Sequence, residues 1–113
     1  MTDKPIRWIG SSLNNLTNFP DTVRKKAGFQ LRAIQGGDTP SDFKPMLTVG
    51  LGVEEIRIRT EDAYRIFYVA RFAEAVYVLH AFHKKTQKTS KLDIEIGQKR
   101  YQQMLQYRQS DQE

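Results

Sequence analysis

Apolar and polar residues alternate in three stretches of the chain, which predicts β-strands at residues 5–10, 53–60 and 63–71. A two-residue period turns one face of a strand toward a core and the other toward water. A fourth stretch, residues 76–82, is almost continuously apolar and rich in β-favouring side chains. Such a run is typical of a strand with neighbours on both sides.

Helical periodicity appears before and after these strands. Residues 20–35 carry one apolar stripe and end at two glycines, as an amphipathic helix does. Ser11 or Ser12 can cap a shorter helix before it. Ser90, with an acidic residue three positions later, predicts the start of a final helix. That helix is expected to bury Leu92, Ile96, Met104 and Leu105, and residues 109–113 are expected to fray.

The resulting order is β-α-α-β-β-β-α, which predicts an α+β fold in a single domain over residues 1–113. Short connections at 61–62 and 72–74 join the last three strands into an antiparallel meander. Residues 38–51 contain two prolines and show no periodicity, so they are predicted to be a loop. We expect the two N-terminal helices and the C-terminal helix to cover one face of the sheet and leave the other face charged.

Composition narrows the classes of function. The 113 residues carry 18 Lys and Arg against 13 Asp and Glu, a net charge of +5, which favours an anionic partner. Cysteine is absent, so disulfides and thiolate catalysis are excluded. The only histidines, His80 and His83, lie on opposite faces of a strand, so we expect no metal and no other cofactor. Without an apolar leader or a membrane-length segment, the expected location is the cytoplasm, with no membrane partner.

A group of cations follows the apolar strand directly. The strand runs without a turn into His83, Lys84 and Lys85, and a rigid strand end suits a site that grips phosphate. By strand parity His83 and Lys85 share a face, and Lys84 points the other way unless the strand ends first. The alternative to a phosphate site is that these cations form a solvent-exposed charged segment that leads into a helix.

Three blocks of sequence resemble the RelE/HigB superfamily, and the last resembles its phage-related HigB-like subgroup. The blocks are GVEEIRIR at 52–59, YRIFY at 64–68 and LHAFHKKTQKT at 79–89. These proteins are toxins of type II toxin–antitoxin modules. The resemblance implies an endonuclease that cleaves mRNA, usually on the ribosome, with a concave basic sheet face as its RNA site. It also implies a small helix-turn-helix antitoxin as partner, with operator DNA bound only through the complex of the two proteins.

Cleavage of this kind needs no metal, because the 2′-hydroxyl of RNA can attack the adjacent phosphate. Arg57 and Arg65, on neighbouring predicted strands, suit stabilisation of the phosphorane. The superfamily places basic residues at what look like these positions, and at Arg59 and Lys85. His83 is the best single candidate for proton transfer. The remaining candidates are Lys84 and Lys85 as acids, Glu54 or Glu55 as a base, and Arg59, Lys88 and Lys91 as RNA-binding residues.

Alternatives stand beside these assignments. Arg57 and Arg59 can pair with Glu55 on an exposed face, and Arg65 can stack between aromatic residues. His80, Trp8, Tyr64, Tyr68 and Tyr101 are predicted to pack rather than act. Neither Arg65 nor His83 is expected in the core. A non-catalytic reading is a decayed toxin used only as a co-repressor, or a basic phage accessory protein that binds nucleic acid.

Overall fold

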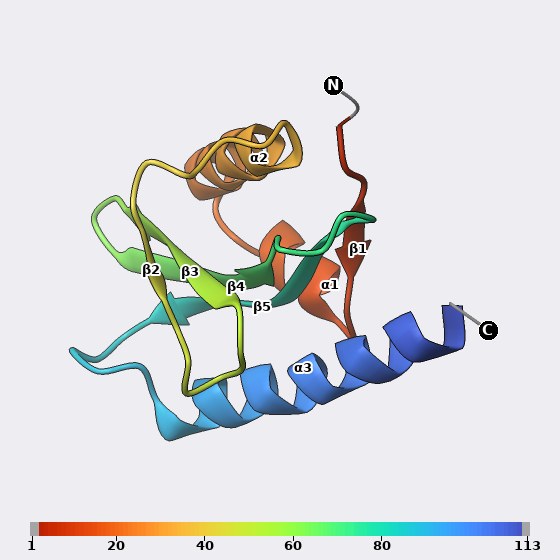
Figure 1. Ribbon diagram of the computed structural model, residues 1–113. Coiled ribbons are helices and arrows are strands. Elements are labelled where there is room, and N and C mark those ends of the chain that lie inside the picture. The colour runs from red at the N-terminus through yellow and green to blue at the C-terminus, as the bar shows by residue number, and fades with distance from the viewer. Residues whose placement is uncertain (1–2, 112–113) are drawn as a thin grey trace.

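The computed structural model describes residues 3–111, which form a five-stranded open sheet and three helices (Figure 1). The strands are β1 (Ile6–Trp8), β2 (Phe43–Pro45), β3 (Val53–Arg59), β4 (Ala63–Val69) and β5 (Val76–Lys84), and the helices are α1 (Ser12–Thr17), α2 (Asp21–Gln35) and α3 (Lys91–Asp111). The sheet order is β1-β5-β4-β3-β2, with β1 parallel to β5 and every other pair antiparallel. The predicted α+β class is confirmed.

Strand β2 was not predicted and is a correction to the expected loop. Lys44 pairs with Glu55 and Pro45 with Glu54, so β2 forms the edge of the sheet beside β3. A three-residue strand is too short to show alternation, and its proline is tolerated because no further strand needs that N–H group.

Strand β5 lies inside the sheet, between β1 and β4, and it contains a bulge. Phe67 pairs with His80 while Tyr68 pairs with Val78, so Leu79 is an extra residue on β5. A bulge reverses the alternation of side chains along the rest of its strand. The bulge therefore decides which face receives the side chains from His80 to Lys84.

The helices cover both faces of the sheet, which corrects the expectation that all three lie on one. Helices α1 and α2 pack on one face, where Val23, Ala27 and Leu31 meet Ile56 and Ile66. Helix α3 crosses the opposite face, where Tyr101 and Met104 join a second core with Phe67, Tyr77 and Leu79 (Figure 1). We call the two surfaces the α2 face and the α3 face.

Helix α3 lies very close to the sheet. A Cβ on Gly97 would sit 2.9 Å from the Phe67 ring, so only glycine permits this approach. The predicted stripe is partly wrong: Leu92 is exposed, while Gly97, Tyr101 and Met104 are buried. The helix also continues to Asp111, beyond the predicted fraying point, and the last two residues lie outside the described part. None of the helices in the described part is both long and apolar enough to span a bilayer.

Candidate functional site

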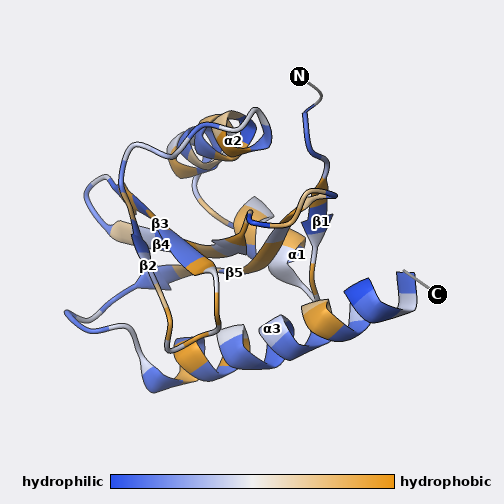
Figure 2. Cartoon of the chain, viewed as in Figure 1, coloured by the Kyte–Doolittle hydropathy of each residue, from blue (hydrophilic) through white to orange (hydrophobic). Residues whose placement is uncertain are grey.

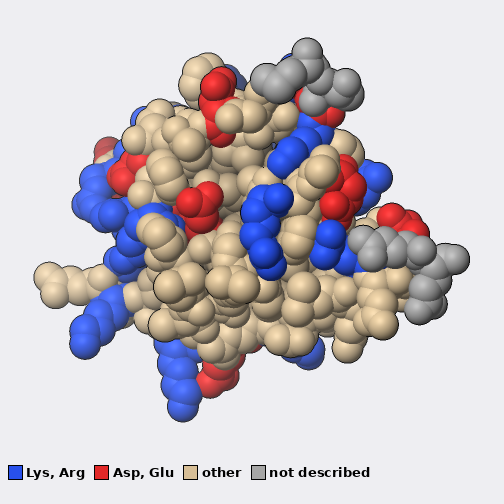
Figure 3. All heavy atoms as spheres, in the orientation of Figure 1, with Lys and Arg blue, Asp and Glu red and all other residues tan. Residues whose placement is uncertain are grey.

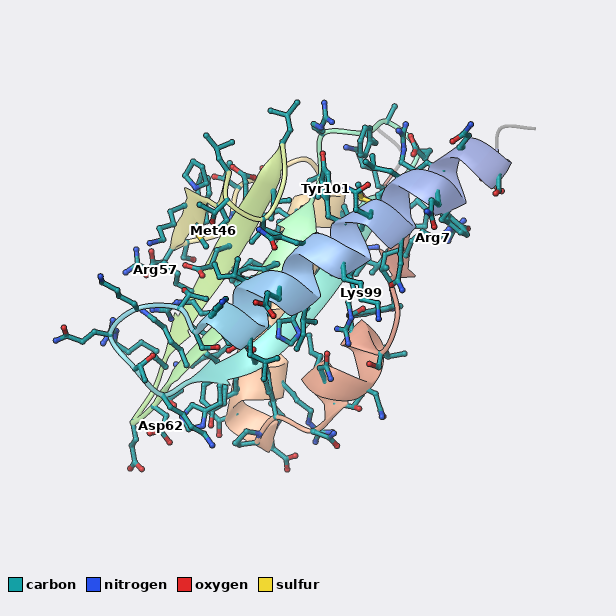
Figure 4. All side chains as sticks on the ribbon, turned by 90° about the horizontal axis from the view of Figure 1, so that it is seen from below. Arg7, Met46, Arg57, Asp62, Lys99 and Tyr101 are labelled. Atoms are coloured by element: carbon teal, nitrogen blue, oxygen red, sulfur yellow. The ribbon has the colours of Figure 1, made fainter. Side chains whose placement is uncertain are left out.

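Basic side chains from four adjacent strands, β2 to β5, gather on the α3 face. Cross-strand pairing aligns Arg57 with Arg65, and Arg59 with Ala63, which in turn pairs with Lys84. Lys44 on β2 pairs with Glu55 on the same face. Figure 4 shows α3 crossing the sheet with Arg57 to one side of its N-terminal half, where the helix does not cover it. The cationic cluster, as we call this set, consists of Lys44, Arg57, Arg59, Arg65 and Lys84.

Arg65 and Glu55 form a buried pair at the centre of this cluster. Arg65 Nε lies 3.5 Å from Glu55 Oε1, and the two side chains are 3% and 1% exposed. Burial raises the pKa of Glu55 and lowers that of Arg65, and in both cases the charge of the other residue opposes the effect. Arg65 therefore belongs to the core, which corrects the expectation that it lies outside it.

Three buried polar atoms in this region have no hydrogen-bond partner among the described residues. They are Glu55 Oε2, Arg57 Nε and Arg65 Nε. The nearest carboxylate to Arg57 is that of Asp42, whose Oδ1 lies 3.8 Å from Arg57 Nε, beyond hydrogen-bond distance. Native proteins leave few such atoms, and each calls for an explanation such as a catalytic role or a bound water or ion. Their convergence beside the exposed cations points to a site that binds a polar ligand.

Lys84 ends β5 and is half-buried beside the pair. Desolvation by burial is the main cause that lowers its pKa below the ordinary lysine value of 10.5, and the charge of Arg65 lowers it further. Glu55 opposes both effects. A lysine of this kind gives up its proton more readily than an exposed one, which suits proton transfer.

We predicted that His83 converges with Arg57 and Arg65. In the structure His83 lies on the α2 face, so this prediction is wrong. Its ring stacks on Tyr64 with centroids 4.9 Å apart, and Tyr64 belongs to the α2-face core. Its Nε2 atom lies 3.7 Å from Asp62 Oδ1, in the β3–β4 hairpin. The predicted opposition of His83 and Lys84 is confirmed, and Lys84 is the one that joins the arginines.

Lys85, predicted as an acid, and the predicted RNA-binding residues Arg59, Lys88 and Lys91 are all exposed. Lys85 and Lys88 are exposed in the 85–90 connection, which Figure 2 shows in hydrophilic colours, and Lys91 is exposed at the start of α3. Figure 3 shows Lys and Arg gathering on the side of the molecule where this connection and the β3–β4 hairpin lie in Figure 1. Arg59, exposed at the end of β3, lies in that region.

His80 links the sheet to the start of α3. Its Nε2 atom lies 2.8 Å from Asp93 Oδ1, and Ser90 Oγ donates to Asp93 Oδ2 at 2.7 Å. The Asp93 N–H donates to Ser90 Oγ at 3.1 Å, which is the predicted cap. His80 is 5% exposed and Tyr101 7%, so both pack as predicted. The network ties down the end of the 85–90 connection.

Sequence reasoning missed Lys44 and the burial of Glu55. Lys44 stands between Phe43 and Pro45 without a strand signal, and Glu55 occupies a position whose alternation indicated an exposed face. Of the two possible bases, only Glu55 is on the α3 face. Glu54 points the other way and accepts a hydrogen bond from Tyr68 Oη at 3.0 Å. Across residues 3–111, no three His, Asp or Glu side chains gather closely enough to hold a metal ion.

Comparison with known families places this geometry in context. Residues 14–102 match the model of the family described as phage-derived protein Gp49-like (DUF891). The chain belongs to this Gp49-like family. The match runs from α1 into α3 and so contains the whole cationic cluster. No curated protein matches the chain.

Proposed function

We propose that this Gp49-like protein is the toxin of a type II toxin–antitoxin module and cleaves mRNA through attack of the 2′-hydroxyl. Three lines support the proposal: membership of a phage-derived family, the resemblance of three sequence blocks to RelE/HigB toxins, and the cationic cluster on the α3 face. The RelE/HigB assignment belongs to this proposal, since the family match names only the Gp49-like group.

One observation carries the chemistry. Arg57 and Arg65 are direct cross-strand neighbours on the α3 face, and Lys84 ends the next strand on the same face. A phosphate on this surface meets fixed positive charge with little water between, where electrostatic stabilisation is strongest. The phosphorane formed during attack carries more negative charge than the substrate, so such a site favours the transition state.

Arg57 and Arg65 lie at different depths below the protein surface. The Arg57 side chain is 34% exposed and can reach phosphate oxygens directly, because a guanidinium matches their geometry. Arg65 lies at the floor, where Glu55 holds it, and contributes positive charge from below. Lys44 and Arg59, both exposed, guide the neighbouring phosphates.

Lys84 is the proton-transfer residue of the proposed site. Lys84 ends β5 beside Arg65 and is partly buried, which lowers its pKa, whereas Lys44 of the same cluster is exposed. As an ammonium, Lys84 can protonate the leaving 5′-oxygen. His83 lines a small hollow with Lys84 and Lys85, but its ring stacks on Tyr64 of the α2-face core, so we assign the proton transfer to Lys84.

The partners follow from the same proposal. A small helix-turn-helix antitoxin neutralises the protein, operator DNA is bound only through the complex of the two, and the substrate is mRNA on the ribosome. The net charge of +5 suits association with the ribosome and with an acidic antitoxin surface.

The test is expression of the wild-type chain alone, followed by mapping of RNA ends. We expect growth arrest and mRNA fragments that end in a 2′,3′-cyclic phosphate and begin with a 5′-hydroxyl. Lys84→Met should abolish both effects. Lys99→Met is the matched control, because it removes an equal charge from an exposed position of α3 away from Arg57 (Figure 4).

Two outcomes would count against the proposal. If soluble wild-type protein accumulates while growth and mRNA remain intact, the toxin assignment is wrong. If purified protein binds RNA without cleaving it, either free or on ribosomes, the protein is the non-catalytic nucleic-acid-binding module.

A further inference from the structure

A hollow of about 470 Å³ lies between α2 and the outer edge of β3. Its lining includes Lys25, Lys26 and Phe29 of α2 together with Arg57 and Arg59 of β3. Phe29 is 72% exposed, although the apolar stripe of α2 faces the sheet. An aromatic ring held open to water beside four cations is not explained by the packing of the fold.

The local structure keeps this hollow open. Strand β2 pairs with β3 only as far as Ile56, and the Arg57 N–H donates to Asp42 O, so no described strand lies beside Ile58 and Arg59 on that side. Gln30 receives a hydrogen bond from Ser41 N at 2.8 Å and donates one to Ser41 Oγ at 3.0 Å. These bonds tie the loop before β2 to Gln30, which lines the hollow.

Arg57 belongs both to this hollow and to the cationic cluster. The hollow is therefore continuous with the proposed cleavage site around the edge of the sheet. Cationic grooves with aromatic platforms are how proteins hold single-stranded nucleic acid, because the cations follow the phosphates while each base stacks on a ring.

We propose that this hollow, the Phe29 subsite, binds the single-stranded RNA that flanks the cleaved phosphate and stacks one base on Phe29. The inference rests on the proposed function and adds a binding position outside the catalytic cluster. Arg59, Lys25 and Lys26 contact the phosphates on either side of the stacked base.

The alternative occupant is an acidic helix or strand of a partner protein. A helix that docks in a groove needs a row of apolar contacts at spacing of three and four residues. Here Phe29 is the exposed apolar ring and Ile58 is buried, while the other lining side chains are Lys, Arg and Gln. One ring among cations suits a stacked base better than a row of apolar anchors.

The experiment measures binding of a short single-stranded RNA, made uncleavable by 2′-O-methylation, through fluorescence anisotropy. Phe29→Ala should weaken binding by about 5- to 150-fold, the range for loss of one base–aromatic stack. Phe29→Trp should retain affinity, and its added emission should be quenched by RNA. Tyr107→Ala is the matched control, since Tyr107 is also exposed, at 42%, but lies near the end of α3.

A second arm locates the base. One abasic position is moved along the RNA: wild-type affinity should fall most at a single position, and Phe29→Ala should be insensitive to an abasic site there. If Phe29→Ala binds as tightly as wild type while Lys84→Met abolishes cleavage, the subsite is wrong and the proposed function stands. If wild type neither binds nor cleaves RNA, both fail. If Phe29→Ala loses binding to a protein partner while its affinity for RNA is unchanged, the hollow is a protein-docking site.

Discussion

At the scale of single residues, the Glu55–Arg65 pair governs both stability and charge at the site. Removing two charges from water costs several kcal/mol per ion, and their attraction repays this only with good geometry and satisfied hydrogen bonds. Here Glu55 Oε2 and Arg65 Nε make no hydrogen bond to any described residue, so the pair does not stabilise the fold efficiently. The pair instead fixes the Arg65 guanidinium under the surface of the site.

Arg65→Met should destabilise the protein by about 3–5 kcal/mol, because Glu55 is then left as a buried unpaired carboxylate. The double variant Arg65→Met/Glu55→Met should recover most of this loss and still fail to cleave RNA. Urea unfolding of the single and double variants measures the coupling. A single variant as stable as wild type would show that the pair contributes no coupled energy.

Lys84→Met should lower the cleavage rate by about 100- to 10,000-fold, the usual contribution of one proton-transfer group. In the wild type, the rate should fall as pH rises through the pKa of Lys84, which burial places below the ordinary value of 10.5. Single-turnover rates of cleavage against pH test this. The falling limb should vanish in Lys84→Met and persist in Lys99→Met; an unchanged profile in Lys84→Met would move proton transfer to another residue.

At the scale of elements, the 85–90 connection carries cations between two fixed ends. Strand β5 holds one end through its pairing with β4, and the network of His80, Asp93 and Ser90 holds the other. Arg100 adds a second tie, since its Nη1 donates to Leu79 O at 3.0 Å and to Asn15 Oδ1 at 2.8 Å. The first half of α3 is therefore positioned by the sheet and α1 together.

His80 should make stability depend on pH. Burial lowers the pKa of folded His80 below 6.5, and Asp93 opposes this effect. The unfolded chain therefore takes up a proton that the folded chain resists, so stability is complete above about pH 6.5 and falls as pH drops below it. Urea midpoints between pH 7.5 and 5 measure the effect. His80→Gln should reduce the slope and His83→Gln should retain it; equal slopes in wild type and His80→Gln would contradict this.

At the scale of the whole molecule, the two faces of the sheet differ in composition and in proposed role. The α2 face is a closed apolar core, whereas the α3 face is apolar under the helix and cationic where β3, β4 and β5 extend past its N-terminal half (Figure 4). The Phe29 subsite joins them around the open edge of β3. Charge on a rigid sheet is preorganised, so little entropy is lost when RNA binds.

Binding of single-stranded RNA should weaken steeply with salt. Each phosphate neutralised contributes a slope of about −0.7 in a plot of log K against log salt, so three to five contacts predict about −2 to −3.5. Lys44→Met should reduce the magnitude of the slope by about 0.7, and Lys99→Met should not change it. Anisotropy titrations between low and moderate salt measure this, and a flat dependence would exclude the cluster as the RNA site.

The sequence by itself determined the local structure and the residues that carry charge. Apolar periodicity, one continuous apolar run and helix caps together predicted every helix and every strand but β2 of the described part, because these patterns record how a local segment meets a core. Strand parity separated His83 from Lys84. Arg57 and Arg65 were expected on neighbouring strands, and the structure pairs them directly.

Only the tertiary structure decided which of these residues meet. The bulge at Leu79 puts Lys84 on the α3 face, and nothing local in the sequence marks a bulge. Glu55 and Arg65 occupy polar positions that alternation assigns to water, yet both are buried on the α3 face, where they pair with each other across β3 and β4. Burial and cross-strand neighbours depend on contacts between segments far apart in the chain, which is why periodicity predicts the elements and leaves the site undecided.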